Sequence, residues 1–394
     1  MIVLTLLALT TLTLYFIIGI DIYFYFREIY SRIGIGRWHS RTVWEEKINT
    51  INRKWLLDPP IVKLTDQNRH IAIDKLNGRY KSNVIQSWQE AGILLGQAST
   101  QQSSQNIQQY LTLKIDPHSK TWKAPIEQVD QALLAYAISY HLEYPEEYKN
   151  LFDDTLNFIL KLMGNDGTIM YRSFLPDVRF VDTLGFICPF LVYYGKTFNE
   201  PQYIDLAIKQ LRTYQQEASL ESSNLVSHAY DIQTKVPLGI YGWGRGMGWY
   251  ILGLLGMYKE LPDNRFDDIT FIKGVIIKTS ETLLPFQNKN GGFNSMIPLA
   301  SSRYDSSITC LAGKLFLAAF QVSENRKFLE ASEKCINRLM GVTRKTGAID
   351  YCQGDTKGIG IYSNTFDVMP FTQGLTVQLV QDYKFIRQCS ESLV

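Results

Sequence analysis

The stretch that decides the fold runs from Gly242 to Leu255 and reads G-W-G-R-G-M-G-W-Y-I-L-G-L-L. Four glycines alternate with larger residues at its start, and an apolar run that is typical of a buried helix follows. We therefore expect a glycine-rich loop that leads directly into a helix. Trp243, Arg245 and Trp249 stand among the glycines.

These three side chains suggest a pocket for an acidic sugar. Tryptophans offer flat apolar faces, and the donors of an arginine fork match a carboxylate. The glycine spacing matches neither the phosphate pattern G-x-x-x-x-G-K-[ST] nor the dinucleotide pattern G-x-G-x-x-G. The same residues also fit a tight turn whose tryptophans pack in the core, and the stretch alone leaves both interpretations open.

Composition narrows the class of protein. The chain has 394 residues, which is long enough for one large core or for two domains. Its 40 Lys and Arg nearly balance its 38 Asp and Glu, which argues against nucleic-acid binding through bulk charge. The five cysteines form no C-x-x-C pair. They therefore predict neither a disulfide framework nor a zinc site, and they favour a reducing compartment.

The N-terminus resembles a membrane anchor. Residues 2–20 carry no charge and are about long enough to cross a bilayer as a helix, and residues 22–26 add an aromatic belt. No basic residue precedes the run and no A-x-A site follows it, so a retained anchor is favoured over a cleaved signal peptide. Arginines at positions 27, 32, 37 and 41 predict that the body faces the cytoplasm. The alternative is a buried helix of a soluble protein.

The rest of the chain is predicted to be all-α. We divide it into an anchor (1–26), a juxtamembrane segment with one helix before Pro59 (27–75) and a catalytic domain (76–394). Apolar residues recur every three or four positions after residue 83, whereas strand-like alternation is sparse. The predicted helices cover 83–98, 126–141, 146–163, 182–194, 201–218, 247–261, 269–286, 306–322, 325–339 and 369–383.

A weak repeat supports a closed ring of helix pairs. The segments 164–171, 290–296 and 346–351 each follow a helix and carry a glycine before an apolar or aromatic residue. They recur at one or two multiples of roughly 55 to 65 residues, which is enough for a helical hairpin and a loop. Such pairs close into an α/α toroid or stack as an open solenoid. The length suits about six pairs, so we predict an (α/α)6 barrel.

Two aspartates begin apolar helices and are candidate acids. Asp130 lies in E-Q-V-D-Q-A-L-L, and Asp182 lies in R-F-V-D-T-L-G-F. An aspartate in this position is commonly a helix N-cap, which is the structural alternative for both. The neighbours of Asp182 are apolar, and such a setting raises the pKa of a carboxyl toward the range of a general acid.

One histidine stands out from the other four. His228 lies in L-V-S-H-A-Y-D, shortly before the glycine stretch, whereas the remaining histidines show no metal-ligand spacing. A lone histidine is also common as a structural residue. No G-x-S-x-G elbow is present, so the sequence does not support a serine triad.

Three blocks together carry a family resemblance. The blocks are V-D-T-L-G-F-I-C-P-F-L-V-Y-Y-G-K (181–196), S-H-A-Y-D (227–231) and W-G-R-G-M-G-W (243–249). In this order they resemble glycoside hydrolase families 88 and 105, the unsaturated glucuronyl and rhamnogalacturonyl hydrolases. The resemblance covers residues 122–383 and implies an (α/α)6 barrel.

The resemblance implies roles for individual residues. Asp182 would be the general acid/base and Asp130 would assist it. His228, Arg245 and Trp249 would contact the substrate, with Arg245 holding the uronate carboxylate. Trp243 would stack on a sugar ring beside Trp249.

It also implies a reaction on oligosaccharides that polysaccharide lyases leave behind. The acid protonates C4 of a terminal C4=C5 unsaturated uronate and water adds at C5. The resulting hemiketal rearranges and releases the neighbouring sugar. No metal or organic cofactor takes part, and no nucleic acid is a partner.

The sequence departs from the family pattern at three places. Met247 stands where asparagine is usual, and Gly185-Phe186 stands where Tyr-Met is commoner, so we expect an altered pocket wall. The anchor is unusual as well. We expect residues 351–363 to cover the barrel mouth. The alternatives are an inverting glycosidase, a sugar epimerase, which the single candidate histidine disfavours, and an inactive glycan-binding protein of a surface-polysaccharide system.

Overall fold

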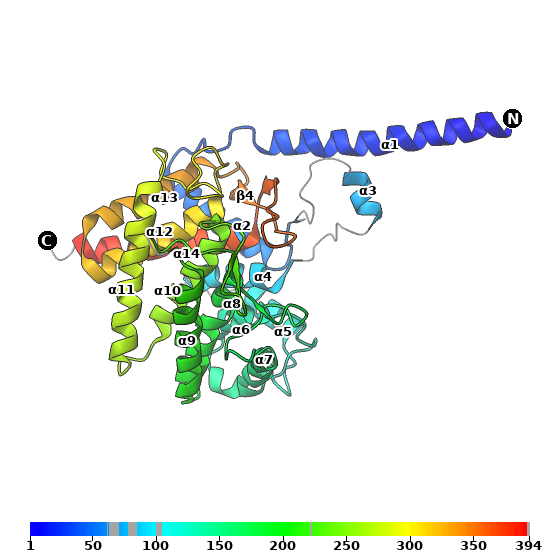
Figure 1. Ribbon diagram of the computed structural model, residues 1–394. Coiled ribbons are helices and arrows are strands. Elements are labelled where there is room, and N and C mark those ends of the chain that lie inside the picture. The colour runs from blue at the N-terminus through cyan, green and yellow to red at the C-terminus, as the bar shows by residue number, and fades with distance from the viewer. Residues whose placement is uncertain (61, 63–70, 78–84, 100–104, 221–222, 392–394) are drawn as a thin grey trace.

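The computed structural model describes residues 1–60, 62, 71–77, 85–99, 105–220 and 223–391 (Figure 1). Within these residues a ring of inner helices forms the centre of the body. Each inner helix contacts the next one along the chain, and α14 contacts α4, so the ring closes. The inner helices are α4 (Ser87–Ala98), α6 (Gln131–Ser139), α8 (Val181–Thr197), α10 (Gly244–Glu260), α12 (Ser306–Ser323) and α14 (Pro370–Glu391).

A second set of helices covers the ring from outside. These helices are amphipathic: α13, for example, buries Phe328, Ala331, Cys335 and Leu339 along one face. Inner helices such as α12 are instead buried on nearly every side. The two layers confirm the predicted (α/α)6 toroid. The outer helices are α2 (Arg41–Trp55), α5 (Gln105–Lys114), α7 (Lys149–Lys161), α9 (Pro201–Ala218), α11 (Phe266–Leu283) and α13 (Arg326–Gly341).

Short strands and turns complete the body. The strand β2 (Ala229–Asp231) pairs antiparallel with both β1 (Val178–Phe180) and β3 (Pro237–Leu238), and β4 (Cys352–Gln353) pairs antiparallel with β5 (Phe366–Asp367). Ala229 lies opposite Phe180 and Leu238, and Gln353 lies opposite Phe366. Short helical segments occur at α3 (Ile71–Leu76), η1 (Pro145–Tyr148) and η2 (Leu284–Phe286).

Glycines close the ring where α14 meets α4. A Cβ atom built on Gly374 would lie 1.8 Å from the carbonyl oxygen of Gly92, and one on Gly96 would lie 2.4 Å from the oxygen of Gly374. No larger residue fits at such a separation, so these glycines allow the first and last inner helices to touch.

The repeated loop motif is a repeated turn. Gly167, Gly291 and Gly347 all have positive φ angles, of 69°, 84° and 94°. Each glycine amide donates to the carbonyl oxygen three residues earlier, at 2.8 to 2.9 Å. The three segments therefore adopt one conformation at equivalent places, which is the structural basis of the weak sequence repeat.

The glycine stretch is not the loop that we expected. The helix α10 begins at Gly244, so the later glycines are helical, and among the four only Gly242 has a positive φ (75°). Close packing against α12 explains why glycines occupy these helical positions. A Cβ atom on Gly248 would lie 2.8 Å from Leu311 Cδ1, and one on Gly244 would lie 2.9 Å from Ile308 Cγ2. These glycines thus bring α10 against α12.

The predicted juxtamembrane segment (27–75) contains α2, one of the outer helices of the toroid. On α2, Trp44 and Ile48 are fully buried; the Trp44 indole donates to Thr343 Oγ1 at 2.9 Å, and Gln373 Nε2 donates to the carbonyl oxygen of Ile48 at 3.0 Å. The helical body therefore begins at α2 and not at residue 76. Residues 61 and 63–70 of the predicted segment lie outside the described residues, as do 83–84 at the start of the predicted 83–98 helix.

The N-terminal helix α1 (Ile2–Ser31) extends away from the body (Figure 1). Its most apolar window has a mean hydropathy of 2.3 and none of that window is buried. By length and composition α1 fits a membrane span, and a signal sequence has the same properties. The helix α12 is also long and apolar enough, but 72% of its window is buried because it is an inner helix.

Candidate active site

The candidate residues gather where the inner helices begin. Asp130 immediately precedes α6, Asp182 lies in the first turn of α8, and Arg245 lies in the first turn of α10. The sheet of β1, β2 and β3 lies at the same end, because the amide of Val181 donates to the carbonyl oxygen of His228 at 3.0 Å. We call this end of the toroid the mouth.

Asp182 has the features of a general acid. It is not an N-cap, since Phe180 holds that position and makes no side-chain cap. Its side chain is 13% exposed, and its Oδ2 has no hydrogen-bond partner among the described residues. Burial raises the pKa of Asp182 to about 7, while Arg245 opposes the rise and Asp355 adds to it. The predicted elevation therefore comes mainly from burial, and the carboxylate that adds to it is Asp355 rather than Asp130.

The imidazole of His228 lies beside the Asp182 carboxyl and is neutral. Its Nε2 is 3.7 Å from Asp182 Oδ2, and its Nδ1 has no partner among the described residues. Burial, together with the charge of Arg245, lowers the pKa of His228 to about 4. At neutral pH the pair is therefore not an ion pair, and His228 offers a neutral donor or acceptor.

Asp130 occupies an N-cap position without capping its own helix. Its Oδ2 accepts from the Trp88 amide of α4 at 3.3 Å instead. Burial raises the pKa of Asp130 to about 6, against the effects of this bond and of Arg172. The structural alternative of a helix cap therefore holds for neither aspartate.

A third carboxylate and a second arginine belong to the same region. Burial is the main cause of the raised pKa of the Tyr171 hydroxyl, and the charges of Asp182, Asp130 and Asp355 add to it. Arg172 lowers the pKa of Asp130 and of Asp182, so its positive charge is near both. Its guanidinium lies over the Tyr171 ring, 4.4 Å from the centroid, and the side chain is half-buried.

Arg245 is occupied by the protein itself. Its two terminal nitrogens donate to the carbonyl oxygens of Gln353 and, at 2.7 Å, of Gly354, and one lies 3.8 Å from Asp355 Oδ1. The side chain is almost fully buried. These bonds favour a structural role for Arg245 in holding the 353–355 segment, whereas the uronate clamp that we expected would need free donors.

Both tryptophans of the glycine stretch are buried. Trp243 donates from Nε1 to Gln353 Oε1 at 3.0 Å, and its ring contacts both the His228 and the Tyr362 rings, at centroid distances of 4.4 and 5.2 Å. Trp249 is 2% exposed and packs against Trp88 of α4 and other aromatic rings of the inner helices. These contacts favour packing for both rings, and contact with a sugar stays a prediction.

The departures from the family pattern lie in the core and not on the pocket wall. Met247 is fully buried, and its sulfur accepts from the Val226 amide at 3.4 Å. A Cβ atom on Gly185 would lie 2.9 Å from the ring of Trp249, and Phe186 packs on the same ring. Both positions therefore influence the site through the packing beneath it.

The segment 351–363 lies at the mouth as predicted. Gln353 and Gly354 hold Arg245, and the Tyr362 ring lies over His228 at 5.7 Å. Asp305, fully buried at the start of α12, accepts from the Gln353 amide at 3.2 Å and so fixes this segment from below. Sequence analysis missed Asp305, Asp355 and Arg172, because none of them stands in a recognisable motif.

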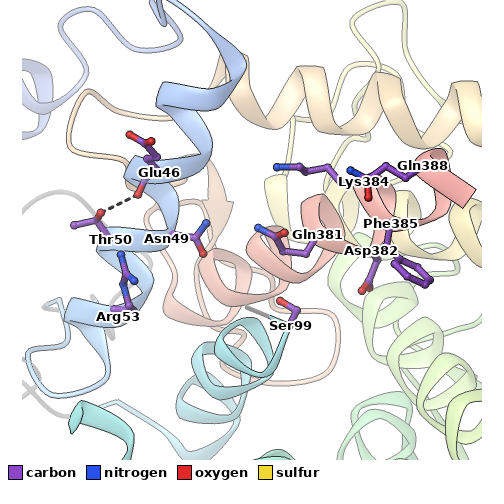
Figure 2. A pocket seen from close by; sticks show the side chains of 10 residues that line it. All are labelled: Glu46, Asn49, Thr50, Arg53, Ser99, Gln381, Asp382, Lys384, Phe385 and Gln388. Atoms are coloured by element: carbon purple, nitrogen blue, oxygen red, sulfur yellow. Dashed lines mark hydrogen bonds between the residues drawn. The ribbon is translucent and has the colours of Figure 1, made fainter. Parts of the chain in front are cut away.

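A large hollow on another part of the surface carries none of this chemistry. It measures about 880 Å³ and lies between α2 and α14, with Glu46, Arg53 and Lys384 among its lining residues (Figure 2). It borders Ser99, where the described chain is interrupted, so we assign it no ligand. Within the described part of the chain, no three His, Cys, Asp or Glu side chains form a group that could hold a metal ion.

The toroid and the acids at its mouth are typical of carbohydrate-active hydrolases, and the comparison with protein families agrees. The family model Glycosyl Hydrolase Family 88 matches residues 89–384. The chain therefore belongs to glycosyl hydrolase family 88, as the sequence blocks predicted, and it is a glycoside hydrolase.

Solved structures share the fold at low identity. A possible member of the GH105 family from Klebsiella pneumoniae subsp. pneumoniae MGH 78578 is 17% identical with a TM-score of 0.72, over 88% of this chain and 94% of that chain. An unsaturated glucuronyl hydrolase specific for heparin is 15% identical with a TM-score of 0.63, over 88% and 98%. The unsaturated glucuronyl hydrolase from Bacillus sp. GL1, responsible for glycosaminoglycan degradation, is 14% identical with a TM-score of 0.61, over 86% and 93%.

Proposed function

We propose that the chain removes a terminal C4=C5 unsaturated uronate from an acidic oligosaccharide by hydrating the double bond. The observation that carries the proposal is Asp182, a buried carboxyl at the mouth with an unpartnered oxygen among the described residues and a pKa of about 7. A group with this pKa is partly protonated at neutral pH, so it can both give and accept a proton.

The proposed reaction balances without an oxidant or a cofactor. Asp182 gives its proton to C4, and the oxygen of a water molecule bonds to C5 while its proton passes to the Asp182 carboxylate. The product is a hemiketal at C5. Its ring opens to a ketone, the proton moves to the ring oxygen, and the hemiacetal left at C1 releases the neighbouring sugar as an alcohol.

Two neighbours assist Asp182 in this proposal. His228 is neutral and has a free Nδ1 among the described residues, so it can orient a substrate hydroxyl or the attacking water. Asp130, with a pKa of about 6, provides a second carboxyl that can accept a hydrogen bond from that water.

We assign the uronate carboxylate to Arg172 in place of Arg245. Arg172 is half-buried, and its charge acts on both Asp130 and Asp182, so a carboxylate held there would lie beside the acid. Its terminal nitrogens contact Gln128 Oε1 at 3.1 Å and Tyr171 Oη at 3.4 Å, which are neutral groups that a carboxylate can displace.

We also propose that α1 anchors the enzyme in a membrane as a single span. Its uncharged run and the aromatic belt after it support the anchor, and the arginines that follow support a cytoplasmic body. The expected test is protease protection in sealed vesicles: a cytoplasmic body is digested only when the inner face of the membrane is exposed.

Absorbance of the conjugated double bond tests the reaction. Lyase-generated oligosaccharides should lose this absorbance with the wild-type enzyme, while saturated oligosaccharides of the same composition should stay intact. Cleavage of the saturated series instead would indicate an inverting glycosidase, which uses two carboxyls on opposite sides of the bond. Binding without cleavage of either series would indicate a glycan-binding protein.

A further inference from the structure

The end of α1 is joined to the mouth by a buried ionic cluster. Asp350 is fully buried, and it accepts from Arg32 at 2.8 and 3.0 Å and from Arg344 at 2.7 Å. Arg344 also donates to Asp367 at 2.7 Å. We call Arg32, Arg344, Asp350 and Asp367 the rim cluster, and it links the residue directly after α1 to the toroid.

The rim cluster belongs to the segment that shapes the active site. Arg32 also donates to the carbonyl oxygen of Phe366 at 2.7 Å, and Phe366 lies opposite Gln353 in the β4–β5 pair. Gln353 in turn accepts from Trp243 and Arg245. A continuous set of hydrogen-bonded residues therefore joins the end of α1 to Trp243, whose indole flanks His228.

No flexible linker separates the apolar run from this junction. The helix α1 is continuous to Ser31, and the uncharged run ends at Ile20. Eleven helical residues span about 17 Å, which limits how far the junction can lie from the end of the apolar run. Beside α1, the amide of Ala72 in α3 donates to Asp21 Oδ1 at 3.2 Å, so another part of the chain already lies at the level where the apolar run ends (Figure 1).

The loops around the mouth carry exposed apolar side chains. Phe174, in the loop before β1, is 75% exposed, and Leu299 and Ile361 are more than half exposed. Each of these loops precedes an inner helix, so all of them lie at the end of the toroid to which α1 is attached. Apolar loop tips beside an anchor are suited to the headgroup region of a bilayer.

We infer that the mouth is held against the membrane surface and that the enzyme acts on acidic glycans carried by lipids in that same membrane. The inference rests on the proposed function and on α1 as an anchor. A glycan attached to a lipid headgroup presents its free terminal uronate within the short distance that α1 and the rim cluster set. A soluble oligosaccharide gains nothing from this arrangement.

Turnover in vesicles tests the inference. The full-length enzyme is placed in phosphatidylcholine vesicles with one unsaturated oligosaccharide, either free or coupled through its reducing end to phosphatidylethanolamine. Confinement to one surface should make turnover of the coupled probe about tenfold faster at equal bulk concentration. A flexible insert of about twenty Gly and Ser residues between Phe26 and Arg27 lets the body move about 25 Å away, and it should remove most of that advantage.

The same insert between Asp263 and Asn264, in the turn at the opposite end of the toroid, is the matched control and should keep the advantage. Turnover of the free probe should be equal in all three proteins. An equal advantage in the Phe26 variant, or none in the wild type, would overturn the inference and leave the proposed function standing. Failure of both probes with the wild type would instead overturn the proposed function.

A measurement without substrate tests the geometry on its own. A fluorophore is attached at Ile361→Cys in a Cys389→Ser background, and a second sample carries it at Asp263→Cys. A quencher on the lipid headgroups should reduce the emission at position 361 and leave that at 263 unchanged. Equal quenching at the two positions, or none at either, would show that the mouth does not face the membrane.

Discussion

Two buried aspartates at the mouth show how surroundings decide the role of a carboxyl. Asp350 in the rim cluster faces two arginines, and although burial alone would raise its pKa, their bonds hold that pKa below the usual value. The Oδ2 atom of Asp182 has no hydrogen-bond partner among the described residues, and burial raises the pKa of Asp182 to about 7. The same side chain is therefore a fixed charge that holds structure in one place and a carboxyl that is partly protonated at neutral pH in the other.

The largest expected effect is the loss of turnover in Asp182→Asn. Without the acid, kcat should fall about a thousandfold, because proton transfer to C4 loses its donor. The melting temperature should stay the same or rise, since an amide needs no charge in this buried position. Asp154→Asn, an exposed change on α7, serves as the control and should leave kcat unchanged. Substantial turnover by Asp182→Asn would remove Asp182 from the mechanism.

Asp350→Asn should have the opposite profile, with a large effect on stability. It leaves Arg32 and Arg344 without their shared carboxylate, and breaking a buried pair in this way costs about 3 kcal/mol in the free energy of unfolding. Urea denaturation measures this loss. Asp382→Asn breaks a half-exposed pair with Lys314 and should cost less than about 1 kcal/mol. Equal losses in the two variants would mean that the rim cluster is not a structural centre.

Arg172→Gln separates binding from chemistry. If Arg172 holds the uronate carboxylate, its loss should cost about 2 kcal/mol of binding, which is roughly a thirtyfold rise in KM, with little change in kcat. Arg212→Gln, on the outer surface over Phe271, is the matched control. An unchanged KM would mean that Arg172 does not hold the uronate carboxylate and that another group at the mouth does.

The two aspartates should also differ in how the stability that they contribute depends on pH. Asp182 has a folded pKa of about 7 against about 3.9 when unfolded, so the folded state keeps a proton that the unfolded state gives up. The free energy of unfolding should therefore fall as pH rises from about 4 to about 7, and Asp182→Asn should remove most of the part of that fall that comes from Asp182. Asp350 has a lowered pKa, so its contribution is present above about pH 4 and is lost in stronger acid.

Local patterns in the sequence predicted the helices well. The amphipathic helix at 201–218 was predicted with its observed bounds, because its buried face recurs at helical spacing. The start of α10 was misjudged because its glycines are selected for contact with α12, which the local pattern does not show. Likewise α2 was assigned to the juxtamembrane segment, since the residues that bury Trp44 and Ile48 lie about three hundred positions later.

The candidate site was predicted where a family block contains a residue or where an aspartate begins an apolar helix, as at Asp130. The sequence blocks contain Asp182 and His228, and the structure places these two side by side. The surroundings of Arg245 were not predictable, because its partners Gln353 and Gly354 come from a segment more than a hundred residues away. Asp355 was not predictable either, because it raises the pKa of Asp182 only through the tertiary contacts that bring its segment to the mouth.

The protonation of Asp182 is the most direct test of the central claim. Infrared difference spectra of the full-length wild type and Asp182→Asn, recorded from pH 5 to 9, would isolate the carboxylic acid band of this one residue. We predict a band that is present at pH 5, disappears with a midpoint near pH 7 and is missing from the variant. A wild-type spectrum identical to that of the variant over this range would mean that Asp182 is already ionised, which would contradict its role as the acid.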